Sequence, residues 1–288
     1  MNNEYVIYAD SSADLSPEIY NEWGVKYSSL TFRFNGEDRE YQNDDMQIGT
    51  FYNKMREGGV AKTSAINSEC FKEEFKKILD EGKDVFYLAF SSGLSTTSNS
   101  ARIAASELSE AYPERRIVIV DSLCASAGVA LLLDMLVEKK NAGASIDELA
   151  AFAESKKLNI CHWFTVDDLV YLKRGGRVSA TTAFVGNMLG IKPVMHVDND
   201  GHLINITKVR GRKTAIAALA DKYGALREEG DYKVFISHGD CLADANGLAD
   251  IIESKYGKKV DLITNVGPVI GAHSGPGTLA LFFVGKER

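Results

Sequence analysis

A buried strand that runs into a hydroxyl-rich loop constrains this chain more than any other feature. Residues 85–90 form an unbroken apolar run, and the loop after it contains Ser92, Gly93 and Ser95 before a helical pattern that includes Ala101. In an open α/β sheet such a loop lies at the carboxyl edge of a strand, where crevices form. The start of the following helix offers unpaired N–H groups and positive potential there. We therefore expect this loop to bind an anion.

The loop does not have the composition of a nucleotide site. It contains no Lys, and it matches neither G-x-x-x-x-G-K-[ST] nor G-x-G-x-x-G. A single carboxylate fits it better than a nucleotide.

In two further strand-loop-helix units the strand also ends in polar residues. A strand over 6–9 ends at Asp10, and a strand over 117–120 ends at Asp121. Strands that alternate with helices predict a parallel sheet covered on both faces. Because parallel strands share one carboxyl edge, Asp10, Ser91 and Asp121 should lie on the same rim.

Composition limits the possible functions. The 288 residues are enough for two domains with sizeable cores, and no apolar run approaches the ~20 residues that span a bilayer, so we expect no stable membrane insertion. The N-terminus has no signal-peptide pattern, which favours a cytoplasmic location. A net charge of -7 and a pI near 5.4 argue against a nucleic-acid binder.

The cysteines and histidines do not predict a metal site. The four Cys residues are far apart without a C-x-x-C pair, and the five His residues include no H-E-x-x-H pair. We expect no metal and no cofactor.

The pattern of elements changes near residue 159. We predict an N-terminal domain over 1–158, with three α/β/α layers and a parallel sheet, and a C-terminal domain over 159–288, with two α/β layers and a mixed sheet. The second domain should contain a helix over 179–189 and a hairpin over 192–209. A ligand would lie in the crevice between the domains.

Two other loops carry polar residues that could serve a site. Thr63 and Ser64 precede a predicted helix over 69–79, although such hydroxyls also act simply as helix caps. The loop over 267–277 is rich in Gly and Pro and presents His273 on unusual backbone. The alternative there is a tight turn with an incidental His.

A serine esterase is the second functional hypothesis. Ser92, His273 and either Asp10 or Asp121 could form a spatial triad. The segment over 271–275 argues against it, because His stands where G-x-S-x-G hydrolases have the nucleophile.

A basic stretch stands out in this acidic chain. Its residues form either a solvated surface or a docking patch for an acidic or phosphate-bearing partner. They are Lys173, Arg174, Arg177, Lys208, Arg210, Arg212 and Lys213.

Seven motifs follow one another along nearly the whole chain, and they begin at Lys62, Ser91, Val120, Lys173, Phe184, Lys208 and His273. Taken together, their order and spacing resemble the DegV family of bacterial fatty-acid-binding proteins. The chain departs from the family pattern at residues 65–67 and 96–98, beside the expected carboxylate site.

The resemblance implies two α/β domains with a long-chain fatty acid buried between them. Its carboxylate would be bound by Thr63 and Ser92, with Gly93 and His273 beside them. The expected supporting residues are Ser64, Ser91, Ser95 and Asp121. The expected acyl-chain lining is Phe164, Leu172, Phe184, Met188, Leu189 and Ile191.

The resemblance also implies a partner. A separate ATP-binding fatty acid kinase subunit would phosphorylate the bound carboxylate for phospholipid synthesis, so this chain would present lipid and catalyse nothing itself. The expected docking residues are Lys173, Arg174, Arg177, Arg210 and Arg212.

Overall fold

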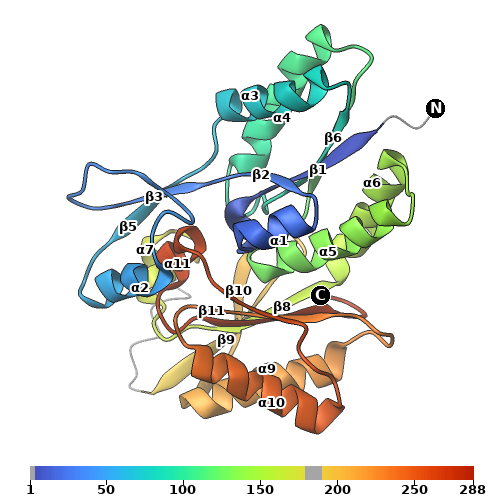
Figure 1. Ribbon diagram of the computed structural model, residues 1–288. Coiled ribbons are helices and arrows are strands. Elements are labelled where there is room, and N and C mark those ends of the chain that lie inside the picture. Colours follow the sequence, from blue (N-terminus) through green and yellow to red (C-terminus); the bar gives the residue numbers. More distant parts are fainter. Residues whose placement is uncertain (1–3, 179–189) are drawn as a thin grey trace.

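The computed structural model describes residues 4–178 and 190–288. The predicted helix over 179–189, with Phe184, Met188 and Leu189, lies outside the described residues. Two main sheets are stacked one above the other, and a small third sheet lies beside them (Figure 1). The predicted α/β fold class, with one parallel and one mixed sheet, is confirmed.

The first sheet is parallel throughout, with strand order β2-β1-β6-β7. Side chains of β6 alternate between two cores: Val85 and Tyr87 pack with α3 and α4, whereas Phe86 and Leu88 pack with α5 and α6. The unbroken apolar run therefore reflects burial on both faces. The elements are β1 (Tyr5–Asp10), η1 (Ser11–Ala13), α1 (Pro17–Glu22), β2 (Lys26–Ser28), α3 (Ser68–Asp80), β6 (Asp84–Ala89), α4 (Thr97–Ala111), β7 (Ile117–Asp121), α5 (Ala127–Asn141) and α6 (Ile146–Lys156).

The second sheet is mixed, with order β10-β9-β8-β13-β11-β12, and only β11 and β12 pair in parallel. Helices α9 and α10 cover its outer face (Figure 1). The predicted hairpin is present as β9 and β10. The elements are η2 (Lys157–Asn159), β8 (Ile160–Thr165), α7 (Val170–Arg174), β9 (Ile191–Val197), β10 (Leu203–Arg210), α9 (Arg212–Leu226), β11 (Val234–His238), α10 (Leu242–Tyr256), β12 (Leu262–Asn265) and β13 (Leu279–Val284).

Helix α5 lies between the two sheets (Figure 1). Ten of its 15 residues are buried. It packs on β8, β11 and β13, and its side chains share one hydrophobic core with residues of both sheets, among them Phe86 and Phe282. The two halves of the chain are therefore joined by a continuous apolar interior.

Two segments that we expected to be loops have regular structure. Thr63 and Ser64 lie in β5 (Ala61–Ser64), which pairs with β3 (Thr31–Phe34); β4 (Tyr41–Gln42) completes the third sheet beside α2 (Ile48–Arg56). The Gly/Pro segment contains the short helix α11 (Pro268–Ser274). Pro268 stands in its first turn, and Gly275 ends it with φ 84°, so both residues mark helix ends here.

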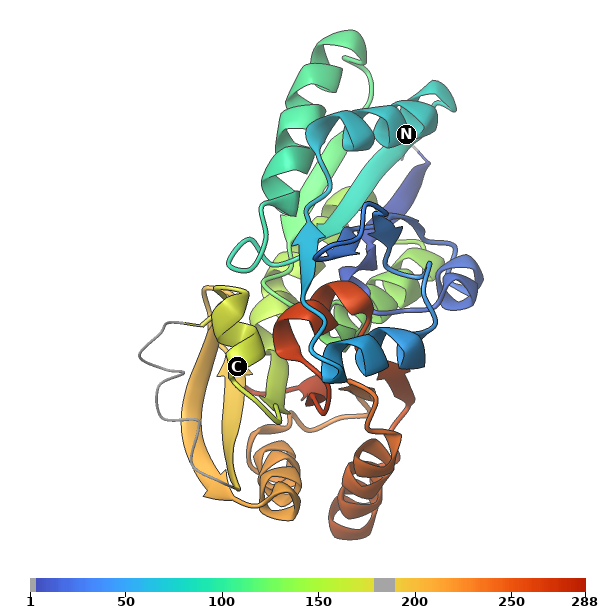
Figure 2. The same cartoon turned by 90° about the vertical axis from the view of Figure 1, so that its left-hand side faces the viewer.

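Figure 2 shows α11 in the middle of the molecule, between the two main sheets and next to α2. None of the described helices combines the length and the apolarity needed to cross a membrane.

A buried carboxyl group lies where the two halves meet. Asp14 follows η1, and its Oδ2 is 2.6 Å from Ser126 Oγ at the start of α5. Thr264 Oγ1 of β12 donates to the Asp14 carbonyl at 2.8 Å. Burial raises the pKa of Asp14 to about 7, although the bond from Ser126 opposes this effect.

Replacing Asp14 with Asn should change how stability depends on pH. The pKa of Asp14 is higher in the folded protein than the ordinary value of 3.8 for this side chain, so its contribution to stability is fully present below pH 3.8 and is lost as the pH rises through about 7. The difference corresponds to about 4 kcal/mol. Denaturant unfolding between about pH 4 and pH 8 should show the wild type losing stability relative to Asp14→Asn as pH rises. The exposed Asp38→Asn is the control, and a pH-independent difference for Asp14→Asn would contradict the prediction.

Candidate functional site

A cavity of about 480 Å³ lies where the carboxyl edge of the first sheet meets the inner face of the second sheet. This volume is within the usual range of small-molecule sites. Its apolar lining consists of Leu30, Ala65, Phe90, Leu94, Ala125, Phe164, Leu172, Val197, Leu203, Val266, Val269, Ile270, Ala280 and Phe282. Its polar lining consists of Thr63, Ser64, Ser92, Ser95, Thr96, Ser126, His162, Arg177, Ser237, His273, Ser274 and Thr278.

Thr63 and His273 meet in this cavity from opposite ends of the chain. Thr63 Oγ1 on β5 is 2.8 Å from His273 Nε2 on α11. Burial, with a smaller effect of Arg177, lowers the pKa of His273 to about 4, so its ring is neutral at pH 7. In the tautomer with a proton on Nε2, the imidazole donates to Thr63 and leaves the Thr63 hydroxyl free to donate to a ligand oxygen.

Gly175 allows His273 to occupy this position. A Cβ at residue 175 would lie 2.1 Å from His273 Nδ1, so a side chain there would displace the ring. Gly175, which directly follows α7, therefore shapes the site because it has no side chain.

The loop after β6 brings some of its predicted residues into the cavity but not all of them. Ser92, Ser95 and Thr96 line it. Ser91 is buried and donates instead to the Gly201 carbonyl at 3.0 Å. A Cβ at Gly93 would lie 2.8 Å from the carbonyl oxygens of residues 200 and 201, so glycine is required by this close approach.

The other supporting residues shape the loops around the cavity. Asp121 Oδ1 accepts from the Ser92 N–H at 3.2 Å and from the Leu123 N–H at 3.0 Å. Ser95 Oγ is 2.8 Å from Thr97 Oγ1 at the start of α4. Ser64 lines the cavity but donates to Glu40 at 3.0 Å.

The proposed serine triad is not assembled. His273 Nε2 contacts Thr63 rather than Ser92. Asp10 accepts from the Tyr87 hydroxyl and two backbone N–H groups, and Asp121 accepts from backbone N–H groups. Among the described residues, no hydrogen bond joins His273 to either aspartate.

Arg177 differs from the exposed docking residue that we expected. Its guanidinium lines the cavity and donates to the Leu94 carbonyl from Nε at 3.2 Å and from Nη2 at 3.1 Å. It also donates to the Gly175 carbonyl. Burial lowers its pKa, and the charge lies close enough to His273 to lower the pKa of that ring as well. A fixed positive charge in the cavity wall favours an anionic ligand.

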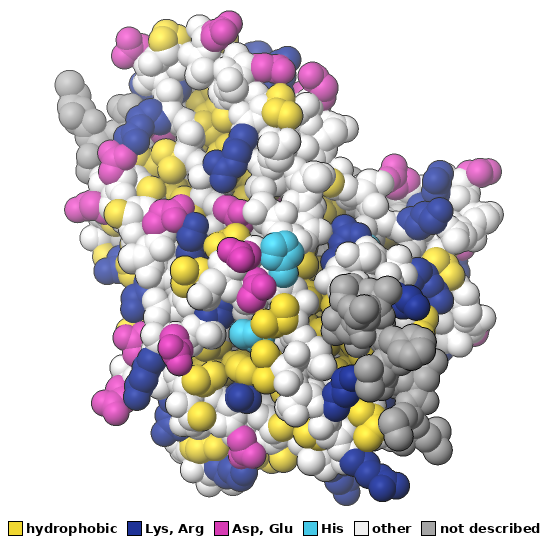
Figure 3. Space-filling model, turned by 180° about the vertical axis from the view of Figure 1, so that it is seen from behind, with side chains coloured by type: hydrophobic (Ala, Val, Ile, Leu, Met, Phe, Trp, Pro, Cys, Tyr) yellow, Lys and Arg dark blue, Asp and Glu magenta, His cyan; other side chains and the backbone are white. Residues whose placement is uncertain are grey.

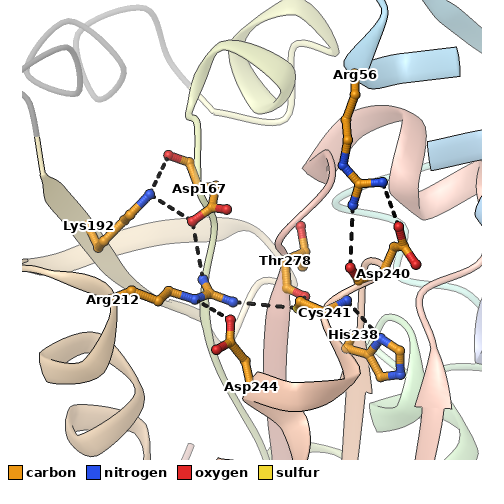
Figure 4. Close-up of polar contacts among 9 residues, drawn as sticks. All are labelled: Arg56, Asp167, Lys192, Arg212, His238, Asp240, Cys241, Asp244 and Thr278. Atoms are coloured by element: carbon orange, nitrogen blue, oxygen red, sulfur yellow. Dashed lines mark hydrogen bonds and ion pairs between the residues drawn. The ribbon is translucent and has the colours of Figure 1, made fainter. Parts of the chain in front are cut away.

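Arg212 is also engaged within the protein (Figure 4). Its Nε is 2.8 Å from Asp244 Oδ2, and its Nη1 is 3.6 Å from Asp167 Oδ1, which also pairs with Lys192. The side chain is only 19% exposed. By contrast, the remaining three predicted docking residues, Lys173, Arg174 and Arg210, are exposed.

The same close-up shows another ion pair, which links α2 to the turn after β11 (Figure 4). Arg56 Nη1 is 2.6 Å from Asp240 Oδ2. Next to this turn, Cys241 Sγ donates to the Thr278 carbonyl at 3.2 Å, and burial raises the pKa of this thiol to about 11. The Cys241 bond holds the loop before β13, whose Thr278 lines the cavity, against the turn after β11, and the Arg56 ion pair holds that turn against α2.

The predicted acyl-chain residues divide into three groups. Phe164 and Leu172 line the cavity, whereas Ile191 begins β9, is half-buried and is not part of the described lining. The remaining three are the residues of 179–189 that lie outside the described residues. Sequence reasoning missed Phe282 and Ser237, although the alternation of inward-facing residues along β13 and β11 was a usable signal.

One group of possible metal ligands occurs among the described residues. Asp198, Asp200 and His202 lie in the turn between β9 and β10, with ligand atoms within 4.8 Å of one another. Asp198 Oδ1 already accepts from the N–H groups of Asp200 and His202. An exposed acidic turn of this kind forms without an ion.

Comparisons with known proteins agree along the whole chain. A family model described as "Uncharacterised protein, DegV family" matches residues 4–286. A DegV domain-containing protein of Clostridium perfringens is 42% identical, and the match covers 99% of both chains. A protein of Thermotoga maritima named fatty acid-binding protein is 35% identical, with 98% of both chains covered. A Thermotoga maritima structure described as revealing fatty acid binding function has a TM-score of 0.84 at 30% identity, covering 98% of this chain and 99% of that one. This chain therefore belongs to the DegV family.

Proposed function

We propose that this protein binds one long-chain fatty acid in the cavity, with the carboxylate held by Thr63 and Ser92 next to His273. Gly93, whose N–H donates to Ser91 Oγ at 3.2 Å, shapes the loop that carries Ser92. The observation that carries the proposal is the Thr63–His273 pair, which opens into a mainly apolar cavity. Arg177 supplies a positive charge in the same wall. Relatives named for fatty acid binding support the same ligand class.

Burial of the acyl chain would provide the affinity. Each methylene removed from water contributes roughly 0.8 kcal/mol, so a dozen contribute on the order of 10 kcal/mol before the cost of association. A carboxylate buried with the chain would offset much of this gain unless donors replaced its water. The hydroxyls of Thr63 and Ser92 and the guanidinium of Arg177 are suitable donors.

The fold suggests how the ligand site is divided. We place the boundary between two domains, residues 1–158 and 159–288, next to η2. The proposed carboxylate donors then come from β5 and the loop after β6 in the first domain and from Arg177, which follows α7, in the second, while α11 supplies His273 beside Thr63. The apolar wall comes from both proposed domains, with Leu30, Phe90 and Leu94 from the first and residues of α7, α11 and the second sheet from the second.

The proposed role is presentation of the bound fatty acid to a separate ATP-binding kinase subunit, for acyl-phosphate formation and phospholipid synthesis. The exposed Lys173, Arg174 and Arg210 are the proposed docking residues. On the face drawn in Figure 3, Lys and Arg predominate at the right of the view, while the rest is mixed in charge. A partner that uses ATP would place this function in the cytoplasm.

Purified protein should carry about one long-chain fatty acid per chain, because a ligand with this much buried apolar surface dissociates slowly. Native mass spectrometry, followed by lipid extraction, would identify it. An empty protein that also fails to bind added octadecanoic or octadecenoic acid would contradict the proposal.

Thr63→Val should weaken fatty acid binding about 10- to 100-fold, because a buried carboxylate loses one donor in a site of similar shape. Ser92→Ala should act in the same direction. Thr31→Val is the matched control, because the Thr31 hydroxyl bonds Glu40 on the exposed side of the same sheet. Titration calorimetry on delipidated protein measures the effect. Equal affinities for Thr63→Val and Thr31→Val would show that the carboxylate lies elsewhere.

Reversing two exposed charges, as in Arg174→Glu with Arg210→Glu, should lower acyl-phosphate formation with a cognate kinase while fatty acid binding stays nearly unchanged. Docking by charge is lost, whereas the cavity is untouched. Added salt should slow the wild type similarly. The control reverses Lys255 and Lys259 near the end of α10. If acyl-phosphate formation fell equally in both double variants, Arg174 and Arg210 would not be specific docking residues.

A further inference from the structure

A pair of hydroxyl groups lies in the cavity wall beside apolar neighbours. Ser126 and Ser237 both line the cavity, and their Oγ atoms are 2.9 Å apart. On the second sheet Ser237 is paired with Ala280, and Ala280 with Phe164, and both of these also line the cavity. The hydroxyl pair is thus a polar position whose neighbours across the sheet, Ala280 and Phe164, are apolar.

Ser126 has a backbone conformation that its role in the helix does not explain. Its φ is 54° and its ψ is -143°, a region that residues with side chains rarely adopt. It is the N-cap residue of α5, yet its side chain makes no capping bond. The Oγ atom lies instead 2.6 Å from Asp14 Oδ2. Strain of this kind concentrates at ligand sites.

Counting protons leaves one acceptor position unused at Ser126. Its hydroxyl lies within hydrogen-bond distance of Asp14 Oδ2 and of Ser237 Oγ, and its single proton can serve only one of them, so Ser126 Oγ accepts at most one hydrogen bond from this pair. A hydroxyl oxygen accepts two hydrogen bonds. Ser126 is 5% exposed and Ser237 is 0% exposed, so Ser126 is the member of the pair that a ligand reaches.

We propose that the cavity takes a fatty acid with a hydroxyl group on an internal carbon, and that this hydroxyl donates to Ser126 Oγ. The inference rests on the proposed fatty acid binding and specifies its ligand class. Hydrogen bonds in series that end on a carboxylate strengthen one another. An unsubstituted chain leaves the acceptor unpaired, and an oxo-substituted chain has no proton to donate.

The competing explanation is purely structural. Asp14, Ser126 and Ser237 come from η1, α5 and β11, so their hydrogen bonds also join the two halves of the chain. A structural tie predicts no preference among ligands, whereas a subsite predicts a preference that depends on the Ser126 hydroxyl.

The test compares octadecanoic acid, monohydroxyoctadecanoic acids with the hydroxyl at different internal carbons, and the matching oxo acids. Affinities are measured on delipidated protein at about pH 8.5, where Asp14, with its pKa of about 7, is ionised. Ser126→Gly removes the hydroxyl and relieves the backbone strain. Ser126→Cys keeps the size of the side chain but bonds weakly. Ser254→Cys, at an exposed position of α10, is the control.

At least one hydroxy acid should bind the wild type and the control about 3- to 10-fold more tightly than octadecanoic acid. The matching oxo acid should gain nothing. In both Ser126 variants the affinity ratio of the preferred hydroxy acid to octadecanoic acid, measured on the same variant, should fall to about one. No preferred hydroxy acid, or a preference that survives in both Ser126 variants, would overturn the inference. Failure of octadecanoic acid itself to bind the wild type would instead contradict the proposed function.

Discussion

The burial of α5 on all sides is the constraint on which the rest of the structure depends. A helix with an apolar surface all round must be covered by more than one layer, and α5 is covered by both main sheets. Because it packs on β8, β11 and β13 while its other side faces the first sheet, it sets the relative position of the two halves. The cavity lies beside its first turn, where Ala125 and Ser126 enter the lining.

The site follows from this arrangement. Thr63 and His273 are 210 positions apart in sequence and meet only because α11 lies next to β5. The cavity combines polar groups of β5, α11 and the loop after β6 with apolar residues from both halves of the chain, and a long apolar anion needs that combination. His273 stays neutral at pH 7, whereas Arg177 brings a permanent charge, so the two side chains would contribute differently to binding of the proposed carboxylate.

Much of the fold was predictable because its signals are local. The strand at 84–89 with its following loop, the hairpin and the alternation of strands and helices depend on side-chain periodicity and turn residues. Residues 26–64, with four short strands and α2, gave no such signal. The assignment of 267–277 to a loop overlooked Pro268 and Gly275 as helix ends. We grouped Arg177 with the surface cations because the residues next to it in sequence do not show whether its side chain points to solvent or into the protein.

The sequence by itself determined the fold class, the sheet edge where an anion could bind, and the family, because periodicity, loop composition and motif order are properties of the chain alone. Only the tertiary structure decided which polar residues share a cavity. Ser91 and Ser92 are adjacent and chemically identical, yet one bonds the carbonyl of Gly201 and the other lines the cavity. That difference arises from packing between segments distant in sequence, which no local pattern encodes.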